Sequence, residues 1–313
     1  MKKIVIAGGS GFLGQALAKS LVAEGYEVVL LGRSRRNSSG LVGRLVPWDA
    51  KNPGEWKKEL ENTQALFNLA GRSIDCRHSS RNRDLILNSR IHATRVLGEA
   101  VALCQTPPKV WLNASTASIY PDIRGDAPAH HEDSPGDAPG FLEDVGRAWE
   151  NEFFQHKREG VRQVAMRISI ILGQDGGAFP VIEKFTRLGL GGTQGPGTQW
   201  MSWLHLDDWV GLARLLLDSH DIAGPVNLAS PEPVTNQVFM KEMRKCFAPW
   251  GIGLPTPTFG IRIGAIFLGT SPELVLKSIK VSASKINKSG YNFIFTQLRP
   301  ALKSFISQEL ANK

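Results

Sequence analysis

The chain opens with the run Ile4-Val5-Ile6-Ala7-Gly8-Gly9-Ser10-Gly11-Phe12-Leu13-Gly14, in which an apolar segment leads directly into a glycine-rich turn. Apolar residues then recur at helical spacing through residue 22. A strand, a glycine turn and a helix in this order predict a dinucleotide-binding turn. Bare backbone can approach a diphosphate closely, and the helix directs its free N–H groups at the anion. We expect the contacts to come from Gly8, Gly11, Phe12, Leu13 and Gly14.

The first half of the chain alternates apolar strands with helical patterns. Strands are predicted over 3–7, 27–31, 65–69, 110–114 and 163–168, and helices over 11–24, 82–104 and 144–159. This alternation predicts an α/β fold of the Rossmann type, with a doubly wound parallel sheet whose ligands bind at the carboxyl ends of the strands.

Two stretches, 118–140 and 173–198, are rich in proline or glycine and are expected to form long loops. We therefore assign residues 1–240 to an NAD(P)-binding domain. Residues 241–313 are assigned to a smaller C-terminal substrate lobe at the carboxyl edge of the sheet.

The composition is typical of a globular protein, with 42% hydrophobic and 21% charged residues among 313. No apolar run approaches the ~18 residues that a membrane span needs, and the first residues do not resemble a signal peptide. The cysteines, Cys76, Cys104 and Cys246, are too few and too widely spaced for a disulfide framework. We expect a cytoplasmic protein with no membrane partner.

The formal net charge of +8 has two interpretations. One is binding to nucleic acid. The other is a basic surface together with a site for an anionic phosphate ligand. Aromatic residues do not interleave with the basic ones, and the glycine turn already accounts for a phosphate. We therefore expect no nucleic-acid partner.

The tip of the second predicted strand indicates which nucleotide binds. Gly32 stands where an NAD-preferring site carries an acidic residue for the ribose hydroxyls, and Arg33 follows. Glycine leaves room for a 2′-phosphate, and a guanidinium can bind it with several donors. The sequence therefore favours NADP, bound by Arg33, whereas Arg35 and Arg36 fit a solvated basic loop as well.

Two further segments are candidates for cofactor contacts. A further short strand is expected just before Trp48-Asp49, which makes it the third in chain order and 65–69 the fourth. Asp49 could accept a hydrogen bond from the adenine amino group; a turn-forming aspartate is the alternative. Leu69, Ala70 and Gly71 close the fourth predicted strand, and the small residues of this segment would let the cofactor lie against its backbone.

Several longer motifs carry a family resemblance over most of the chain. They are the glycine turn 8–14, Asn68-Leu69-Ala70-Gly71, Ser89-Arg90-Ile91, Arg147-Ala148-Trp149-Glu150, Gly189-Leu190-Gly191-Gly192, Trp203-Leu204-His205-Leu206-Asp207-Asp208 and Gly224-Pro225-Val226-Asn227-Leu228-Ala229-Ser230-Pro231. With these the chain resembles the extended, atypical short-chain dehydrogenases/reductases. Within them it is similar to an NAD(P)-dependent epimerase/dehydratase-like subfamily often labelled cell-division-inhibitor-like. The resemblance implies a C-terminal lobe that covers the site.

The resemblance also implies a serine at the end of the fifth strand and a Tyr-x-x-x-Lys pair one helix later, in which the lysine lowers the pKa of the tyrosine. Ser115 matches the serine. The pair is missing, because neither 141 and 145 nor 142 and 146 are Tyr and Lys. The usual tyrosinate mechanism therefore cannot operate, although binding of the cofactor does not depend on this pair.

Two residues are candidates to supply what the missing pair would have done. Tyr120 lies five residues after Ser115 and is a candidate proton donor; the alternative is an aromatic wall beside the nicotinamide. Arg167, at the end of the sixth predicted strand, could contact a ligand phosphate; a structural salt bridge is the alternative. The segment around His205 offers no third ligand for a metal, so we expect none. His205 is expected to orient the glycine loop, and Asp207 or Asp208 to cap the next helix.

The sequence leaves two functions open. The first is an NADP-dependent oxidoreductase or epimerase acting on a small-molecule substrate that the sequence does not identify. The second is a non-catalytic NADP-binding protein, either a redox sensor or a partner-binding protein. Either could be a monomer or a homodimer.

Overall fold

The computed structural model describes residues 2–33 and 40–311; Arg35 and Arg36 lie outside this range. Its centre is a seven-stranded parallel sheet in the order β10-β6-β5-β4-β1-β2-β3. The strands are β1 (Lys3–Ala7), β2 (Glu27–Gly32), β3 (Arg44–Pro47), β4 (Ala65–Asn68), β5 (Val110–Thr116), β6 (Arg162–Ile168) and β10 (Gly224–Leu228). The order reverses at β1, which confirms the doubly wound Rossmann fold.

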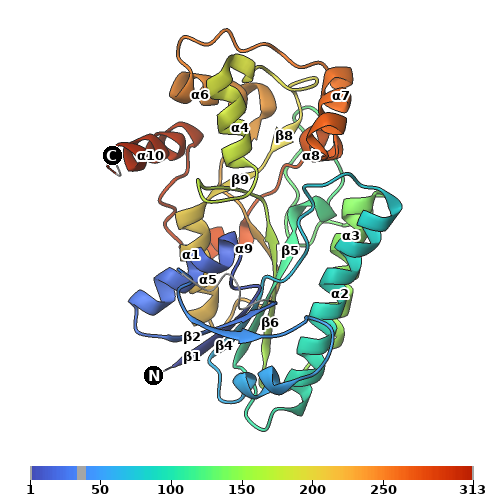
Figure 1. Ribbon diagram of the computed structural model, residues 1–313, viewed down its shortest axis with the longest axis vertical. Helices are drawn as coiled ribbons and strands as arrows, with labels where there is room; N and C mark the ends of the chain where they lie inside the picture. Colours follow the sequence, from blue (N-terminus) through green and yellow to red (C-terminus); the bar gives the residue numbers. More distant parts are fainter. Residues whose placement is uncertain (1, 34–39, 312–313) are drawn as a thin grey trace.

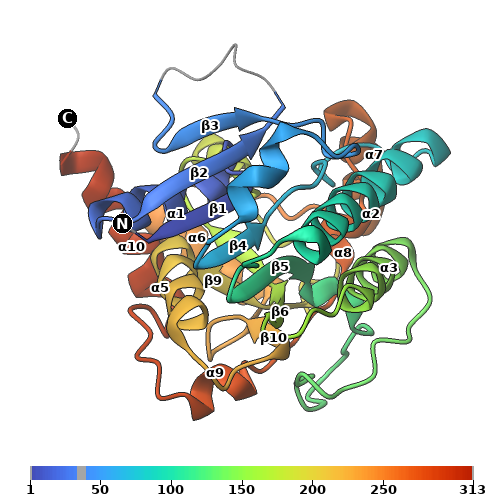
Figure 2. The same ribbon diagram turned by 90° about the horizontal axis from the view of Figure 1, so that it is seen from below.

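Helices cover both faces of the sheet (Figure 2). One face packs on α1 (Phe12–Ala23) and α5 (Leu206–Asp218), and the other on α2 (Ser80–Leu103) and α3 (Phe141–Gln155). The residues of β1 alternate between these two hydrophobic clusters, with Ile4 and Ile6 on one side and Val5 on the other. The strand is therefore apolar throughout, as strands buried on both faces are.

A second group of elements lies beyond the carboxyl ends of the strands (Figure 1). It contains β7 (Ile170–Leu172), α4 (Phe179–Phe185), η3 (Thr186–Leu190), β8 (Trp200–Met201), β9 (Trp203–His205), β11 (Val234–Thr235), α6 (Asn236–Phe247), α7 (Thr258–Leu268), α8 (Glu273–Leu276) and α10 (Leu298–Ala311). Its core joins Phe179 of α4, Phe239 of α6 and Phe305 of α10. These residues lie on both sides of position 240, where the domain boundary stays a prediction.

The described structure corrects two expectations. The stretch 173–198 was expected to be a loop, but it contains α4 and η3, and α4 starts at Phe179 with Pro180 in its first turn, where a missing N–H costs nothing. The helix expected from 144 starts three residues earlier, at Phe141. Glu143 and Asp144 lie in its first turn, where carboxylates favour the positive end of the helix dipole.

The connections complete the fold. Short 3-10 helices, η1 (Glu55–Leu60) and η2 (Ala117–Ile119), follow β3 and β5, and α9 (Ser284–Lys288) lies beside β10. Of the helices in the described ranges, none combines the length and apolar character required to cross a bilayer.

Candidate functional site

The glycine turn after β1 is built for close backbone approach. Gly8 has φ +75°, and a Cβ there would lie 2.8 Å from the carbonyl of Leu69. A Cβ on Gly14 would lie 2.6 Å from the Cα of Gly9. Helix α1 begins at Phe12. Within residues 2–33 and 40–311 no side chain caps its N-terminus, and its first turn has no acidic residue. Its first N–H groups are therefore available to an anion, and the binding of a diphosphate there stays a prediction.

The tip of β2 lies beside this turn. A Cβ on Gly32 would meet the side chain of Leu45 at 2.8 Å and the Ser10 Oγ at 3.7 Å. A side chain at 32 would therefore clash with Leu45, so glycine lets β2 end close against Leu45 and beside the glycine turn. Arg33 follows directly and is exposed. The contact of Arg33 with a 2′-phosphate stays a prediction that this placement permits.

A buried amide network holds the loop after β4. Asn68 donates through Nδ2 to Asn113 Oδ1 at 2.6 Å and to Thr94 Oγ1 at 3.1 Å. Its Oδ1 accepts the backbone N–H of Ala70 at 3.1 Å, and Leu69 N–H donates to the carbonyl of Ala7 at 2.9 Å. The segment Leu69 to Gly71 is therefore fixed next to the glycine turn.

Asp49 forms a turn, which is the alternative that the sequence left open for it. Its Oδ1 accepts the N–H groups of Lys51 and Asn52, each at 2.9 Å, and its Oδ2 accepts the Asn52 side chain at 2.6 Å. The hydrogen bonds from Asn52 lower the pKa of this carboxyl. A contact between Asp49 and adenine stays a prediction.

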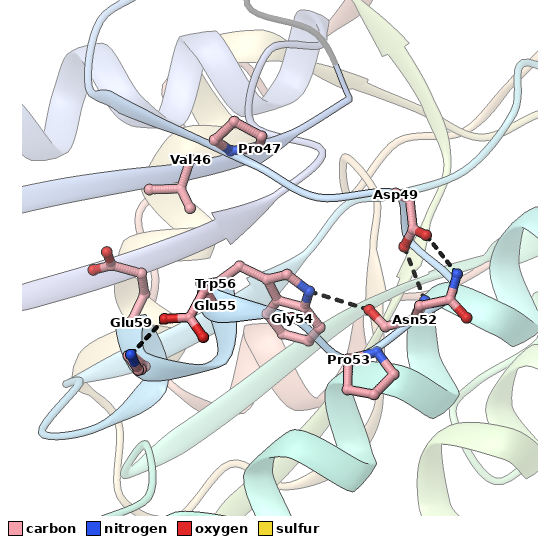
Figure 3. A pocket seen from close by; sticks show the side chains of 10 residues that line it. Val46, Pro47, Asp49, Asn52, Pro53, Gly54, Glu55, Trp56 and Glu59 are labelled. Carbon is pink, nitrogen blue, oxygen red and sulfur yellow. Dashed lines mark hydrogen bonds and ion pairs between the residues drawn. The ribbon is translucent and has the colours of Figure 1, made fainter.

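Asp49 also borders a cavity of about 650 Å³ beside β3 and η1 (Figure 3). The indole N–H of Trp56 donates to the Asn52 carbonyl here at 3.2 Å, which fixes the wall of the cavity. The other lining residues are Val46, Pro47, Pro53, Gly54, Glu55, Lys58 and Glu59. Among the predicted site residues only Asp49 lines it, so the cavity is separate from the glycine turn.

The slot for the expected Tyr-x-x-x-Lys pair lies at the start of α3. Leu142 is buried there, and a Cβ on Gly146 would lie 3.1 Å from Thr116 Cγ2 and 3.2 Å from Ile119 Cβ. Helix α3 thus packs against the end of β5 at its glycine. Positions 142 and 146, which are one of the two spacings considered for the pair, lie at the end of β5. They are Leu and Gly, so neither supplies a phenol or an ammonium group.

Ser115 and Arg167 meet on one buried carboxylate. Arg167 binds Glu150 of α3 through two hydrogen bonds of 2.8 Å, one from Nε and one from Nη2. Ser115 Oγ donates to the same Glu150 Oε1 at 2.6 Å. All three residues are at most 7% exposed. The salt bridge is the structural alternative left open for Arg167, and its contact with a ligand stays a prediction.

Tyr120 belongs to the same network. Its ring is fully buried and stacks on His130, and its hydroxyl accepts from Arg167 Nη1 at 2.6 Å and donates to Asn227 Oδ1 at 2.9 Å. Burial raises the pKa of the phenol. A phenol with both partners inside the protein and a raised pKa is a weak proton donor, so the catalytic role predicted for Tyr120 gains no support from this geometry.

Sequence reasoning missed the residues that complete this network. Glu132 accepts the Asn227 N–H at 3.2 Å through its carboxylate and the Arg167 guanidinium at 3.0 Å through its carbonyl. Glu150 carried a signal, since it ends one of the resemblance motifs, but neither its partners nor those of Glu132 can be read from local spacing.

His205 has a different role from the one expected. Its Nδ1 accepts the N–H of Asp207 at 3.1 Å and so caps α5, where Asp207 or Asp208 was expected to cap. Asp208 instead accepts the backbone N–H groups of Ile294 and Phe295, at 2.7 and 2.9 Å, and anchors the C-terminal segment. The imidazole is the side chain that stands at the cap position, which explains the difference.

The buried cap predicts a pH dependence of stability. Burial lowers the pKa of His205 to about 4, below the 6.5 of a free imidazole. The unfolded chain therefore binds more protons than the folded chain between these values, so stability falls as the pH drops through this window. We expect the free energy of unfolding to fall by about 2 kcal/mol between pH 7 and pH 5 from this group. His205→Asn keeps a cap without a titrating ring; urea titrations at both pH values should show a smaller loss for it, and an equal loss would contradict this assignment.

The comparisons with known proteins place the chain in a family. A family model described as the NAD dependent epimerase/dehydratase family matches residues 4–143, and a domain of unknown function, DUF1731, matches residues 256–305. The epimerase family protein YfhF of Bacillus subtilis is 31% identical over 306 residues, covering 97% of this chain and 98% of the relative. The Staphylococcus aureus epimerase family protein SAR0825 is 30% identical, covering 98% and 100%.

Solved structures agree with this placement. The human epimerase family protein SDR39U1, crystallised with NADPH, has a TM-score of 0.83 and 28% identity, covering 96% of this chain and 98% of the human chain. A nucleoside-diphosphate sugar epimerase from Corynebacterium glutamicum has a TM-score of 0.74 and 25% identity, covering 99% of this chain and 61% of its own. The chain belongs to the epimerase family of extended short-chain dehydrogenase/reductase-like proteins.

Proposed function

We propose that the protein binds NADP(H) across the carboxyl edge of its sheet and uses it in an oxidoreductase or epimerase reaction on a small molecule. The observation that carries this proposal is the bare glycine turn at the uncapped N-terminus of α1, with Gly32 and Arg33 beside it. The diphosphate would lie on Gly8, Gly11 and the first N–H groups of α1. The NADPH bound by the human family member supports the same coenzyme here.

The two halves of the cofactor would lie on opposite sides of β1. The adenosine half would reach Arg33 and Asp49 at the ends of β2 and β3, and the nicotinamide half would reach Leu69 to Gly71 and Ser115 beyond β4 and β5. Residues 241–313 would form the lobe that contacts the substrate, together with the neighbouring elements that share its core.

Removal of the Arg33 guanidinium should change coenzyme preference. Only NADP(H) carries the 2′-phosphate, and Arg33→Ala would remove charge-assisted hydrogen bonds to it. The affinity for NADPH should therefore fall about 10- to 100-fold, and the affinity for NADH by less than about threefold. Isothermal titration calorimetry with both coenzymes measures this. An equal loss for the two would contradict the assignment of Arg33.

A second candidate function is NADP(H) binding without turnover, as in a redox sensor. The hydrogen bonds of Ser115, Tyr120 and Arg167 favour this second candidate. They go to Glu150 and Asn227 inside the protein and leave these side chains few donors or acceptors for a substrate. Reduced-nicotinamide absorbance during incubation with sugar nucleotides, aldehydes and ketones discriminates the two. Bound NADP(H) with no turnover supports the sensor. Turnover that survives Tyr120→Phe and is lost in Ser115→Ala supports the enzyme and excludes Tyr120 as its proton donor.

A further inference from the structure

Arg90 on α2 is a partly buried arginine with no acidic partner among the described residues. Its Nη1 donates to the carbonyls of Arg72 and Ile86, each at 3.0 Å. Nε and Nη2 make no hydrogen bond to any protein atom within residues 2–33 and 40–311, and no carboxylate there lies within 4.0 Å. Burial alone lowers the pKa of Arg90 to about 10, so the side chain stays charged at neutral pH. The guanidinium is partly buried, and its Nε and Nη2 have no protein partner within the described residues, so these donors are available to a charged ligand.

Arg162 is a matched arginine that needs no ligand. Burial lowers its pKa as well, and it too has no acidic partner in the part of the chain that the structure describes. Its Nη1 donates to Ile222 O at 2.8 Å, and its Nη2 donates to Leu216 O at 2.7 Å and to Leu217 O at 3.3 Å, near the C-terminus of α5. The negative end of that helix dipole stabilises the charge of Arg162. Arg90 has no such contact with the C-terminus of a helix.

The position of Arg90 follows from its neighbours. One turn later in α2, Thr94 accepts hydrogen bonds from Asn68 at the end of β4 and from Trp149 of α3. Because α2 runs back antiparallel to the strands, Arg90 lies nearer the carboxyl edge than Thr94 does. Its guanidinium lies over the Trp149 ring, 5.0 Å from the centroid.

The guanidinium also faces the loop that borders the cofactor turn. A Cβ on Gly71 would lie 3.3 Å from Arg90 Cζ and 3.5 Å from each of its Nη atoms. The same loop begins at Leu69, whose carbonyl lies against Gly8. A positive charge with free donors thus lies at the β4 side of the glycine turn, opposite to Arg33, which follows β2.

We propose that Arg90 is an oxyanion-binding residue of this cleft, which binds a phosphate or carboxylate group on the β4 side of the glycine turn. The group could belong to the cofactor diphosphate or to the substrate, and both present the same charged oxygens to the guanidinium fork. The inference rests on the proposed nucleotide site.

Titrations of Arg90→Leu distinguish the two sources. The probes are NADPH, adenosine 2′,5′-bisphosphate, and inorganic phosphate added to free and to NADPH-loaded protein. If the anion is the diphosphate, the variant binds NADPH at least about tenfold more weakly while adenosine 2′,5′-bisphosphate changes by less than about threefold. If the anion belongs to the substrate, NADPH binding is unchanged and phosphate binding to the loaded protein is lost. Arg90→Lys, which keeps the charge, should retain part of either affinity.

Arg162→Leu is the control, and thermal unfolding without ligand is the second readout. We expect Arg162→Leu to lower Tm and to leave the affinities alone, whereas Arg90→Leu leaves Tm unchanged or raises it, because it removes a desolvated charge. Wild-type affinities for all probes in Arg90→Leu, or a Tm loss equal to that of Arg162→Leu without loss of affinity, would overturn the proposal. If the wild-type protein binds no NADPH, the proposed function fails, and phosphate binding to the free protein then decides the role of Arg90 by itself.

Discussion

Gly11→Val should abolish NADP(H) binding and leave the fold nearly unchanged. Gly11 has φ −81° and ψ 174°, which valine adopts readily. Among the described residues, its added Cβ would meet only the Gly8 carbonyl, at 3.3 Å. The branched side chain would stand at the N-terminus of α1, where the diphosphate is proposed to lie. Because the diphosphate could no longer approach the backbone closely, the affinity for NADPH should fall by more than about 100-fold.

Gly264→Val on α7 is a matched control for this variant. Gly264 has no heavy atom within 4 Å of an added Cβ and lies far along the chain from the turn. Calorimetry with NADPH and thermal unfolding should be run on both variants. Wild-type affinity in Gly11→Val would show that the nucleotide does not use this turn. A large fall in Tm for Gly11→Val alone would mean that the glycine serves the fold rather than the ligand.

Arg167→Met should be strongly destabilising. The substitution leaves the Glu150 carboxylate buried with only the Ser115 hydroxyl as a described partner, and it removes the donor to Tyr120. Breaking a buried ion pair on one side costs about 3–5 kcal/mol. Urea denaturation at pH 7 measures the free energy of unfolding. At this magnitude, much of the stability typical of a globular domain would be lost.

Arg95→Met is the control for this second variant. Arg95 also binds a carboxylate through two hydrogen bonds, to Glu152 at 3.0 and 2.8 Å, but its side chain is 51% exposed. The Glu152 side chain is only 10% exposed, but it keeps a contact of 3.2 Å with His156 Nε2, and the exposure of Arg95 limits the expected loss to about 1 kcal/mol. Similar losses in the two variants would contradict the structural role of the buried network. A stable Arg167→Met protein with weakened NADPH binding would show instead that Arg167 contacts the nucleotide.

Elements formed by local interactions could be predicted from the sequence, whereas elements held by contacts between distant segments could not. Strand β1 and the glycine turn were predicted from local pattern, because apolar residues, glycines and helical spacing are read within one short window. The helix in 179–185 was missed because glycine and proline on both sides of it suggested a loop. Its stability comes from Phe179, which packs on Phe247 and Phe305, and these contacts are distant in sequence.

The polar network was beyond local reasoning for the same reason. Ser115, Glu150 and Arg167 come from β5, α3 and β6, and each is an ordinary residue in its own segment. Only the packing of α3 on the sheet brings them together. The sequence could therefore offer Arg167 two roles without choosing between them. The family resemblance supplied the position at which a Tyr-x-x-x-Lys pair would stand, and the absence of these residue types from 141–146 is read directly from the sequence.

The central claim is that the glycine turn and Arg33 select a 2′-phosphorylated nicotinamide coenzyme. Calorimetric titration of the full chain with NADPH and with NADH tests it most directly. We predict a dissociation constant below about 10 µM for NADPH and an affinity at least about tenfold weaker for NADH. No detectable heat with millimolar NADPH, or equal affinity for the two coenzymes, would contradict the account.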